Sequence, residues 1–260
     1  MKKTYWIIFF LFIGSLSMPS WALEIQSEAH NEKKIAGDQI LQRVDRNLFP
    51  ESAQMIYQLV NRKPNGKEET IILYIARSDR HEMVLLGVAP DYLKGRSALR
   101  VANEMWIHMP GEIDLRQMSL QEYWFGGTFN NGDILQGDYH LDFSADLTRE
   151  SDQEYLLKLT SKKSQAPFQR GEMRVDKALL LPIELTYYDF GDKIAKQIKF
   201  KEIRPFGQGV TRPAILESAS ILNPGYVSLL KLGQIQARSF PKEAFSLQFL
   251  SNVGSILLKE

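Results

Sequence analysis

Three aspartates recur at every fourth position near the middle of the chain, and no other spacing in the sequence points as clearly to a cation-binding or catalytic group. Asp138, Asp142 and Asp146 would share one face if this stretch were helical, and His140 lies between them. Carboxylates gathered on one face can bind a cation or divide acid and base roles. The residues between them fit a strand or an irregular loop equally well, and the three carboxylates would then be solvated.

The other residue types that perform chemistry are missing or scattered. The chain has no cysteine and no G-x-S-x-G motif, so covalent catalysis has little support. Its histidines, at positions 30, 81, 108 and 140, form no H-x-x-x-H pair, and no cysteine can complete a zinc site. We therefore expect no catalytic residue, no metal and no cofactor, and an enzyme is the least favoured hypothesis.

The N-terminal residues have the layout of a secretory signal peptide. Paired lysines precede the apolar run of residues 5–16, and small residues follow it. The run is shorter than the roughly 20 apolar residues that a helix needs to cross a bilayer. We expect residues 1–22 to be a signal peptide that is cleaved after Ala22, which places the mature protein in a bacterial periplasm.

The charge and length of the mature chain narrow the class of protein. Removing Lys2 and Lys3 lowers the formal net charge from +1 to −1, because residues 1–22 contain no acidic residue. This near-neutral balance argues against a nucleic-acid partner. Residues 23–260 show no internal repeat and no linker, so we predict one domain.

An amphipathic helix followed by antiparallel strands is the secondary structure that the apolar periodicity predicts. The helix, "GDQILQRVDRNL", has Asp38 as its expected N-cap and apolar residues at positions 40, 41, 44 and 48. Beyond Pro50 the period becomes two, and clusters of Pro, Gly, Asn and Asp mark turns. We predict strands over residues 54–62, 68–77, 81–88, 97–102, 105–109, 113–118, 154–161, 171–176, 181–189, 193–203, 213–222 and 226–237.

The clearest hairpin is predicted from Leu181 to Lys201, with its turn at Gly191 and Asp192. In "KIAKQIKFK" apolar and polar residues alternate, as expected of a sheet with one buried and one wet face. Lys196 is the one exception, because it falls on the apolar face. The pattern thus predicts a half-buried strand with a single lysine out of place.

Two segments lack a strand period. Residues 120–150, "LQEYWFGGTFNNGDILQGDYHLDFSADLTRE", are rich in aromatics and glycine, and we expect them to cross over an opening with short helical fragments. The tail "SFPKEAFSLQFLSN" predicts a short turn or helix whose phenylalanines pack against the sheet.

Three blocks of sequence share the pattern of one known family. The first matches that pattern at Lys94, Gly95, Leu99, Asn103, Trp106 and Pro110, with His108 in the usual Tyr position. The second matches at Trp124, Gly126, Phe129 and Asp133. The third matches at Val175, Asp176, Lys177, Pro182, Tyr188, Asp189 and Lys196, with Arg174 in place of a Trp. In this order, over roughly residues 55–205, they resemble a divergent branch of the LolA-like outer-membrane lipoprotein-sorting proteins.

This resemblance implies a mainly β (α+β) fold: an unclosed antiparallel β-barrel with an N-terminal amphipathic helix and short helices covering its cavity. It also implies a periplasmic carrier of lipid or lipoprotein acyl chains, served by an inner-membrane exporter or an outer-membrane acceptor. From the alternation we expect an apolar cavity lined by Leu73, Leu85, Leu99, Met105, Trp106, Leu157 and Phe200.

Two alternatives fit the same pattern. Those side chains could simply fill a solid core, because a packed sheet shows the same alternation. The scaffold could also serve as a protein-interaction module, an accessory to an envelope exporter or a sensor of envelope proteins.

Overall fold

The computed structural model describes residues 36–48, 52–78, 82–135, 138–163, 168–207 and 209–258. The expected signal peptide lies outside these ranges. Within them, no helix has the length and apolar character needed to cross a membrane.

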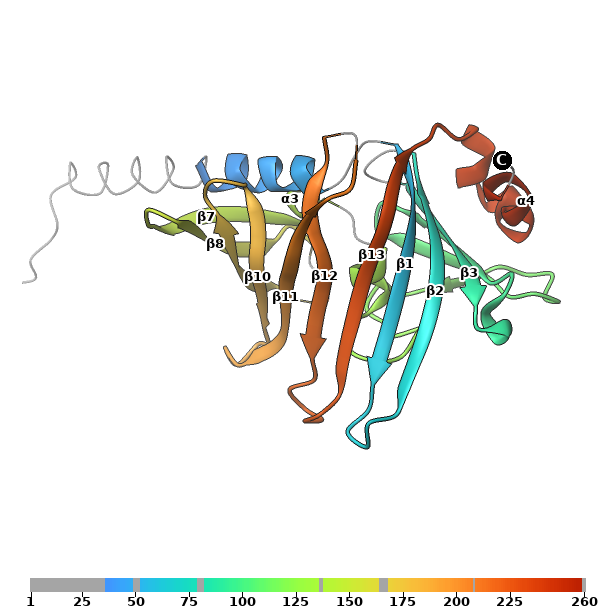
Figure 1. Ribbon diagram of the computed structural model, residues 1–260, viewed down its shortest axis with the longest axis horizontal. Helices are drawn as coiled ribbons and strands as arrows, with labels where there is room; N and C mark the ends of the chain where they lie inside the picture. The colour runs from blue at the N-terminus through green and yellow to red at the C-terminus, as the bar shows by residue number, and fades with distance from the viewer. Residues whose placement is uncertain are drawn as a thin grey trace, which may run out of the picture. The chain divides into compact units, whose positions relative to one another are not determined.

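The described residues form one antiparallel sheet of 13 strands in the order β6-β5-β4-β3-β2-β1-β13-β12-β11-β10-β9-β8-β7 (Figure 1). The strands are β1 Ala53–Arg62, β2 Glu68–Arg77, β3 Glu82–Ala89, β4 Ser97–Val101, β5 Glu104–His108, β6 Arg116–Met118, β7 Phe143–Glu150, β8 Glu154–Ser161, β9 Arg170–Asp176, β10 Leu181–Tyr188, β11 Ile194–Pro205, β12 Thr211–Ala219 and β13 Val227–Ala237. The two edge strands, β6 and β7, follow each other along the chain. The segment between them therefore has to connect one edge of the sheet to the other.

Each of the twelve strands that the sequence predicts is present, with ends that differ by a few residues. The predicted hairpin is confirmed as β10 and β11, and Asp192 in its turn has a φ of 61°. β7 is the strand that the sequence did not predict. The expected unclosed, mainly β fold is confirmed.

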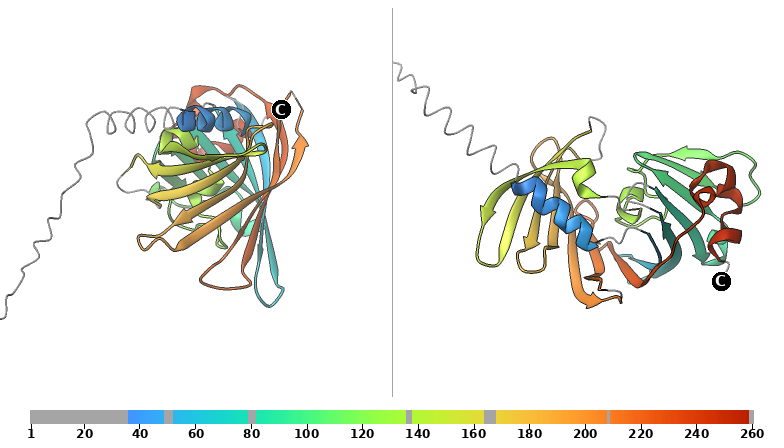
Figure 2. Two further views of the ribbon diagram at one scale, coloured as in Figure 1. Left: turned by 90° about the vertical axis from the view of Figure 1, so that its left-hand side faces the viewer. Right: turned by 90° about the horizontal axis from the view of Figure 1, so that it is seen from above.

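The sheet curls, and the N-terminal helix of residues 36–48 lies across its β7 side (Figure 2). Its residues Leu41, Val44 and Leu48 are fully buried and belong to the apolar core. Asp38 is not the N-cap, because the helix already includes residue 36; its Oδ1 instead accepts a hydrogen bond of 2.7 Å from the Ala145 amide. The helix approaches β7 closely, since a Cβ at Gly37 would lie 2.3 Å from the Ala145 carbonyl oxygen.

The crossover, defined here as residues 119–142, connects β6 to β7 and contains two short helices, α2 Asn131–Ile134 and α3 Tyr139–Asp142. A capping box fixes the start of α2: the Asn130 side chain accepts from the Asp133 amide, and the Asp133 carboxylate accepts from the Asn130 amide. Phe125, Phe129 and Ile134 of the crossover are buried in the main core.

The sheet buries apolar residues on both faces. The first cluster lies on the face that the N-terminal helix and the crossover cover. On the opposite face of β2–β5, a second cluster forms under the C-terminal cover, residues 240–258, which contains η2 Lys242–Phe245, η3 Leu247–Asn252 and α4 Gly254–Leu257. In Figure 1 this cover lies beside β3. The prediction that the tail phenylalanines pack is confirmed for Phe240 and Phe245.

Candidate ligand-binding site

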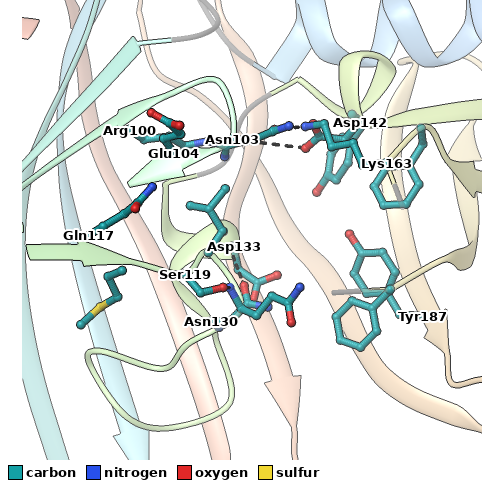
Figure 3. A pocket seen from close by; sticks show the side chains of 17 residues that line it. Arg100, Asn103, Glu104, Gln117, Ser119, Asn130, Asp133, Asp142, Lys163 and Tyr187 are labelled. Carbon is teal, nitrogen blue, oxygen red and sulfur yellow. Dashed lines mark hydrogen bonds and ion pairs between the residues drawn. The ribbon is translucent and has the colours of Figure 1, made fainter. Parts of the chain in front are cut away.

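A cavity of about 590 Å³ lies where the crossover meets the two edges of the sheet (Figure 3). Ligand-binding cavities in proteins usually measure roughly 300–1,000 Å³, so this one can hold a small organic molecule or part of a lipid. It is lined by Arg100, Asn103, Glu104, Gln117, Met118, Ser119, Leu120, Gln121, Asn130, Gly132, Asp133, Tyr139, Asp142, Phe143, Lys163, Phe168 and Tyr187.

One side of the cavity is aromatic. Phe168 stacks on Tyr187 with ring centroids 4.5 Å apart, and Phe143 lies 6.0 Å from Tyr187. Burial raises the pKa of Tyr187 well above its ordinary value, as it does for Tyr139, so both hydroxyls stay protonated at neutral pH. These rings adjoin the first apolar cluster, to which Phe143, Tyr139 and Tyr187 belong.

A second side carries charges, visible in Figure 3 as the group of Arg100, Asn103, Asp142 and Lys163. The Arg100 guanidinium lies 3.6 Å from Asp142, and the Lys163 ammonium contacts both Asp142 and Asn103. Arg100 also donates to the Ala102 carbonyl at 2.9 Å and to the Leu135 carbonyl. Burial lowers the pKa of Arg100 and Asp142 opposes that shift; a guanidinium nevertheless stays protonated. A fixed cation and an ion pair therefore border the cavity.

The lysine that breaks the alternation of β11 explains how the crossover is anchored. Lys196 is only 5% exposed and its ammonium pairs with Asp133 of α2. It also lies 5.5 Å from the ring centroid of Phe129 and 5.7 Å from that of Tyr123. The anomaly in the sequence was thus the signal of a buried ion pair that joins the crossover to the sheet.

The crossover has two further polar attachments. Asp138 and Arg77 are both fully buried and form an ion pair of 3.2 Å. Asp45 of the N-terminal helix accepts hydrogen bonds from the amides of Tyr139 and His140 at 2.9 and 2.8 Å, and it lies 2.8 Å from Nδ1 of His140. These contacts fix α3 between the helix and the sheet.

The three spaced aspartates do not share a helix face. Asp138 precedes α3, Asp142 ends it, and Asp146 lies on β7. The first two are engaged by arginine or lysine. Within the described ranges no group of three His, Asp or Glu side chains could hold a metal ion.

The residues predicted to line a cavity lie on two faces of the sheet. Leu73, Leu85, Met105, Leu157 and Phe200 belong to the first cluster. Leu99 belongs to the second cluster and Trp106 packs against it, so these two lie on the opposite face from the other five. The cavity in Figure 3 is lined by other residues, although it adjoins the first cluster. Whether any of the seven contacts a ligand stays a prediction.

Comparison with known proteins assigns the fold. A family model described as "-like: Uncharacterized protein" matches residues 79–252. The chain belongs to that family. Its fold is that of the LolA superfamily, as shown by a LolA superfamily protein from Nitrosomonas europaea: the TM-score is 0.75 at 22% sequence identity, over 82% of this chain and 99% of the other.

Two more solved structures share the LolA fold. A domain described as an outer membrane lipoprotein-sorting protein, from Vibrio parahaemolyticus, gives a TM-score of 0.73 at 12% identity and covers 84% of this chain and 100% of its own. A DUF1329 family protein from Desulfovibrio piger gives 0.73 at 18% identity, over 84% and 99%. No curated protein matches the sequence. The resemblance noted in the sequence is thus confirmed at the level of the fold.

Proposed function

We propose that this protein is a periplasmic, non-enzymatic binder or carrier of lipid or lipoprotein acyl chains, made as a precursor with a signal peptide of residues 1–22 and a single mature domain of residues 23–260. The observation that carries the proposal is the cavity beside the crossover, which has an aromatic side next to a charged side. The Vibrio parahaemolyticus domain with the same fold is described as a lipoprotein-sorting protein, which supports the same role here.

The two sides of the cavity match the two ends of an amphiphile. The acyl chain would lie against Phe143, Phe168 and Tyr187, and the polar end would meet Arg100 and Lys163. Each buried methylene contributes about 0.8 kcal/mol, so a chain of roughly fourteen carbons gains about 10 kcal/mol before ordering costs. Binding of this kind depends on burial and needs no nucleophile or metal.

The length of such a chain sets a further requirement. Three lining residues, Tyr139, Phe143 and Tyr187, belong to the packed first cluster, so a long chain reaches further into the core only if the crossover or core side chains shift. Binding energy from the buried chain would have to offset that rearrangement. When a carrier delivers its ligand, the return of the crossover and core side chains to their packed arrangement favours release.

Displacement of a fluorescent fatty acid from the purified mature protein tests the proposal. Phe168→Ala removes part of the aromatic side and should weaken binding roughly tenfold. Lys163→Gln should weaken binding of an anionic amphiphile more than that of an uncharged one. Ile113→Ala, at a side chain 97% exposed, is the control and should bind like the wild type.

Mass spectrometry of protein purified from its own periplasm gives an independent measurement, and a stoichiometric lipid is the expected result. Protein that is repeatedly empty and also ignores the fluorescent fatty acid would contradict the proposal. If the same empty protein captured an envelope protein, the interaction-module hypothesis would be favoured.

A further inference from the structure

Two neighbouring hairpin turns form a projecting tip that neither the core nor the cavity uses. They are the β1–β2 turn, residues 63–67, and the β12–β13 turn, residues 220–226, called here the tip pair. β1 and β13 are paired up to Arg62 and Val227, and a Cβ at Gly225 would lie 3.1 Å from Cβ of Pro64. In Figure 1 both turns extend at the lower end of the sheet.

The tip pair exposes large apolar side chains. Leu222 is 89% exposed, and Ile221 and Tyr226 are 46% and 37% exposed. The turn that presents them is ordered: the Asn223 amide donates to the Ser220 hydroxyl at 3.0 Å, and the Tyr226 amide donates to the Asn223 carbonyl at 3.2 Å. Because the backbone is fixed in this way, the exposure of Leu222 is built into the turn.

The charges of the tip pair are all positive. Its sequences, KPNGK and SILNPGY, contain two lysines and no acidic residue. Lys63 and Lys67 are both exposed. The carboxylates that follow in β2 are engaged elsewhere, since Glu68 pairs with Arg62 at 2.6 Å and Glu69 accepts from the hydroxyl of Tyr92.

Two other exposed apolar residues in turns, Ile113 and Phe190, lack this combination. Ile113 is as exposed as Leu222, but Glu112 and Asp114 flank it. Phe190 lies beside Asp189 and close to Asp192. Glu112 pairs with Arg116 and Asp192 pairs with Arg170, so neither of those turns carries a net positive charge. An anionic surface would therefore attract the tip pair more strongly than those two turns.

We propose that the tip pair docks this protein on the surface of a phospholipid membrane that contains anionic lipid. Leu222 and Ile221 enter the boundary between headgroups and acyl chains, Tyr226 lies at headgroup level, and Lys63 and Lys67 contact phosphates. The tip is narrow and projecting, which suits insertion into a fluid surface better than the broad contact of roughly 800 Å² per partner in a stable protein complex. This inference does not rest on the proposed acyl-chain binding.

Sedimentation with sucrose-loaded vesicles of phosphatidylethanolamine containing one third phosphatidylglycerol tests the inference on the mature protein. The wild type should sediment with the vesicles, and less so at high salt. Leu222→Asp should weaken the association at least tenfold. The double variant Lys63→Gln and Lys67→Gln should lose roughly thirty-fold on these vesicles and little on vesicles of uncharged phosphatidylcholine.

The matched control is Ile113→Asp, which places the same new charge on an equally exposed apolar residue outside the tip pair, and it should bind vesicles like the wild type. The inference is overturned if the wild type ignores the vesicles, if Leu222→Asp binds them unchanged, or if Ile113→Asp loses as much. Fatty-acid displacement without vesicles should be the same in Leu222→Asp and the wild type. Failure of docking is therefore distinguishable from failure of acyl-chain binding.

Discussion

The sheet carries two covers, and they are attached by different kinds of contact. The C-terminal cover is held mainly by apolar side chains, including Phe245, Leu250 and Leu257. The crossover also buries apolar residues, but it adds buried ion pairs to Arg77 and Lys196.

The cavity is found beside the crossover, and this difference suggests why. Apolar contacts pack best with no space left between them, whereas ion pairs fix a segment at a few points and leave room among those points. A cover held at points can border a binding site while the rest of the sheet stays tightly packed. Substitutions in each cover can test this contrast.

Removal of the buried carboxylate at Asp138 should have the largest effect. Asp138→Ala removes the carboxylate that pairs with the fully buried Arg77 guanidinium, which should lower the free energy of unfolding by about 3–5 kcal/mol. Urea denaturation followed by circular dichroism measures this change. Glu68→Ala is the control: Glu68 also pairs with an arginine, but its side chain is 45% exposed and that of its partner Arg62 is 51% exposed, so the loss should stay under about 1 kcal/mol. Equal losses in the two variants would mean that the buried ion pair of the crossover stabilises the fold no more than an exposed ion pair does.

Shortening one buried side chain of the C-terminal cover should lower stability less and should leave ligand binding in the cavity unchanged. Leu250→Ala removes a buried side chain between the cover and β4, and it should cost about 2–3 kcal/mol, because the adjacent short helices can settle into the space. Fatty-acid displacement should be unchanged, since the second cluster lies on the opposite face from the cavity. A variant that lost fatty-acid binding while remaining folded would show that the two covers are coupled.

The sequence predicts the hairpins but not β7, and the reason is whether the signal for each element is local. Hairpins were predictable because their period of two and their turn residues are local signals. β7 was missed because its alternation, Phe143, Ala145 and Leu147, overlaps the aspartates at every fourth position. The Ala145 amide of β7 also donates a hydrogen bond to Asp38 of the N-terminal helix, which is distant in sequence. No local pattern shows such a contact.

The candidate site is harder to predict from the sequence than the fold, for a physical reason. Alternation places Leu99 and Arg100 on opposite faces, but it does not say which face borders a cavity. The C-terminal cover buries the second face as well, so both faces carry apolar residues and the apolar pattern selects neither. The buried charges are better guides, because Lys196 stands out in the sequence as an exception to the alternation and pairs with Asp133 in the structure.

Alkaline titration gives the smallest and most specific test, because it follows Tyr139 of the crossover and Tyr187 of the aromatic side. Burial raises the pKa of both well above the ordinary value of about 10. Above about pH 10 the unfolded chain releases these protons while the folded protein keeps them, so the stability present below pH 10 is lost as pH rises. Each tyrosine should cost up to about 1.4 kcal/mol per pH unit. Urea denaturation at about pH 8, 10 and 11 should show a shallower decline in Tyr187→Phe than in the wild type, and Tyr226→Phe, at an exposed ring, is the control. Identical declines in Tyr187→Phe and the wild type would mean that water already reaches the Tyr187 hydroxyl, and the aromatic side would then be a poor place for an acyl chain.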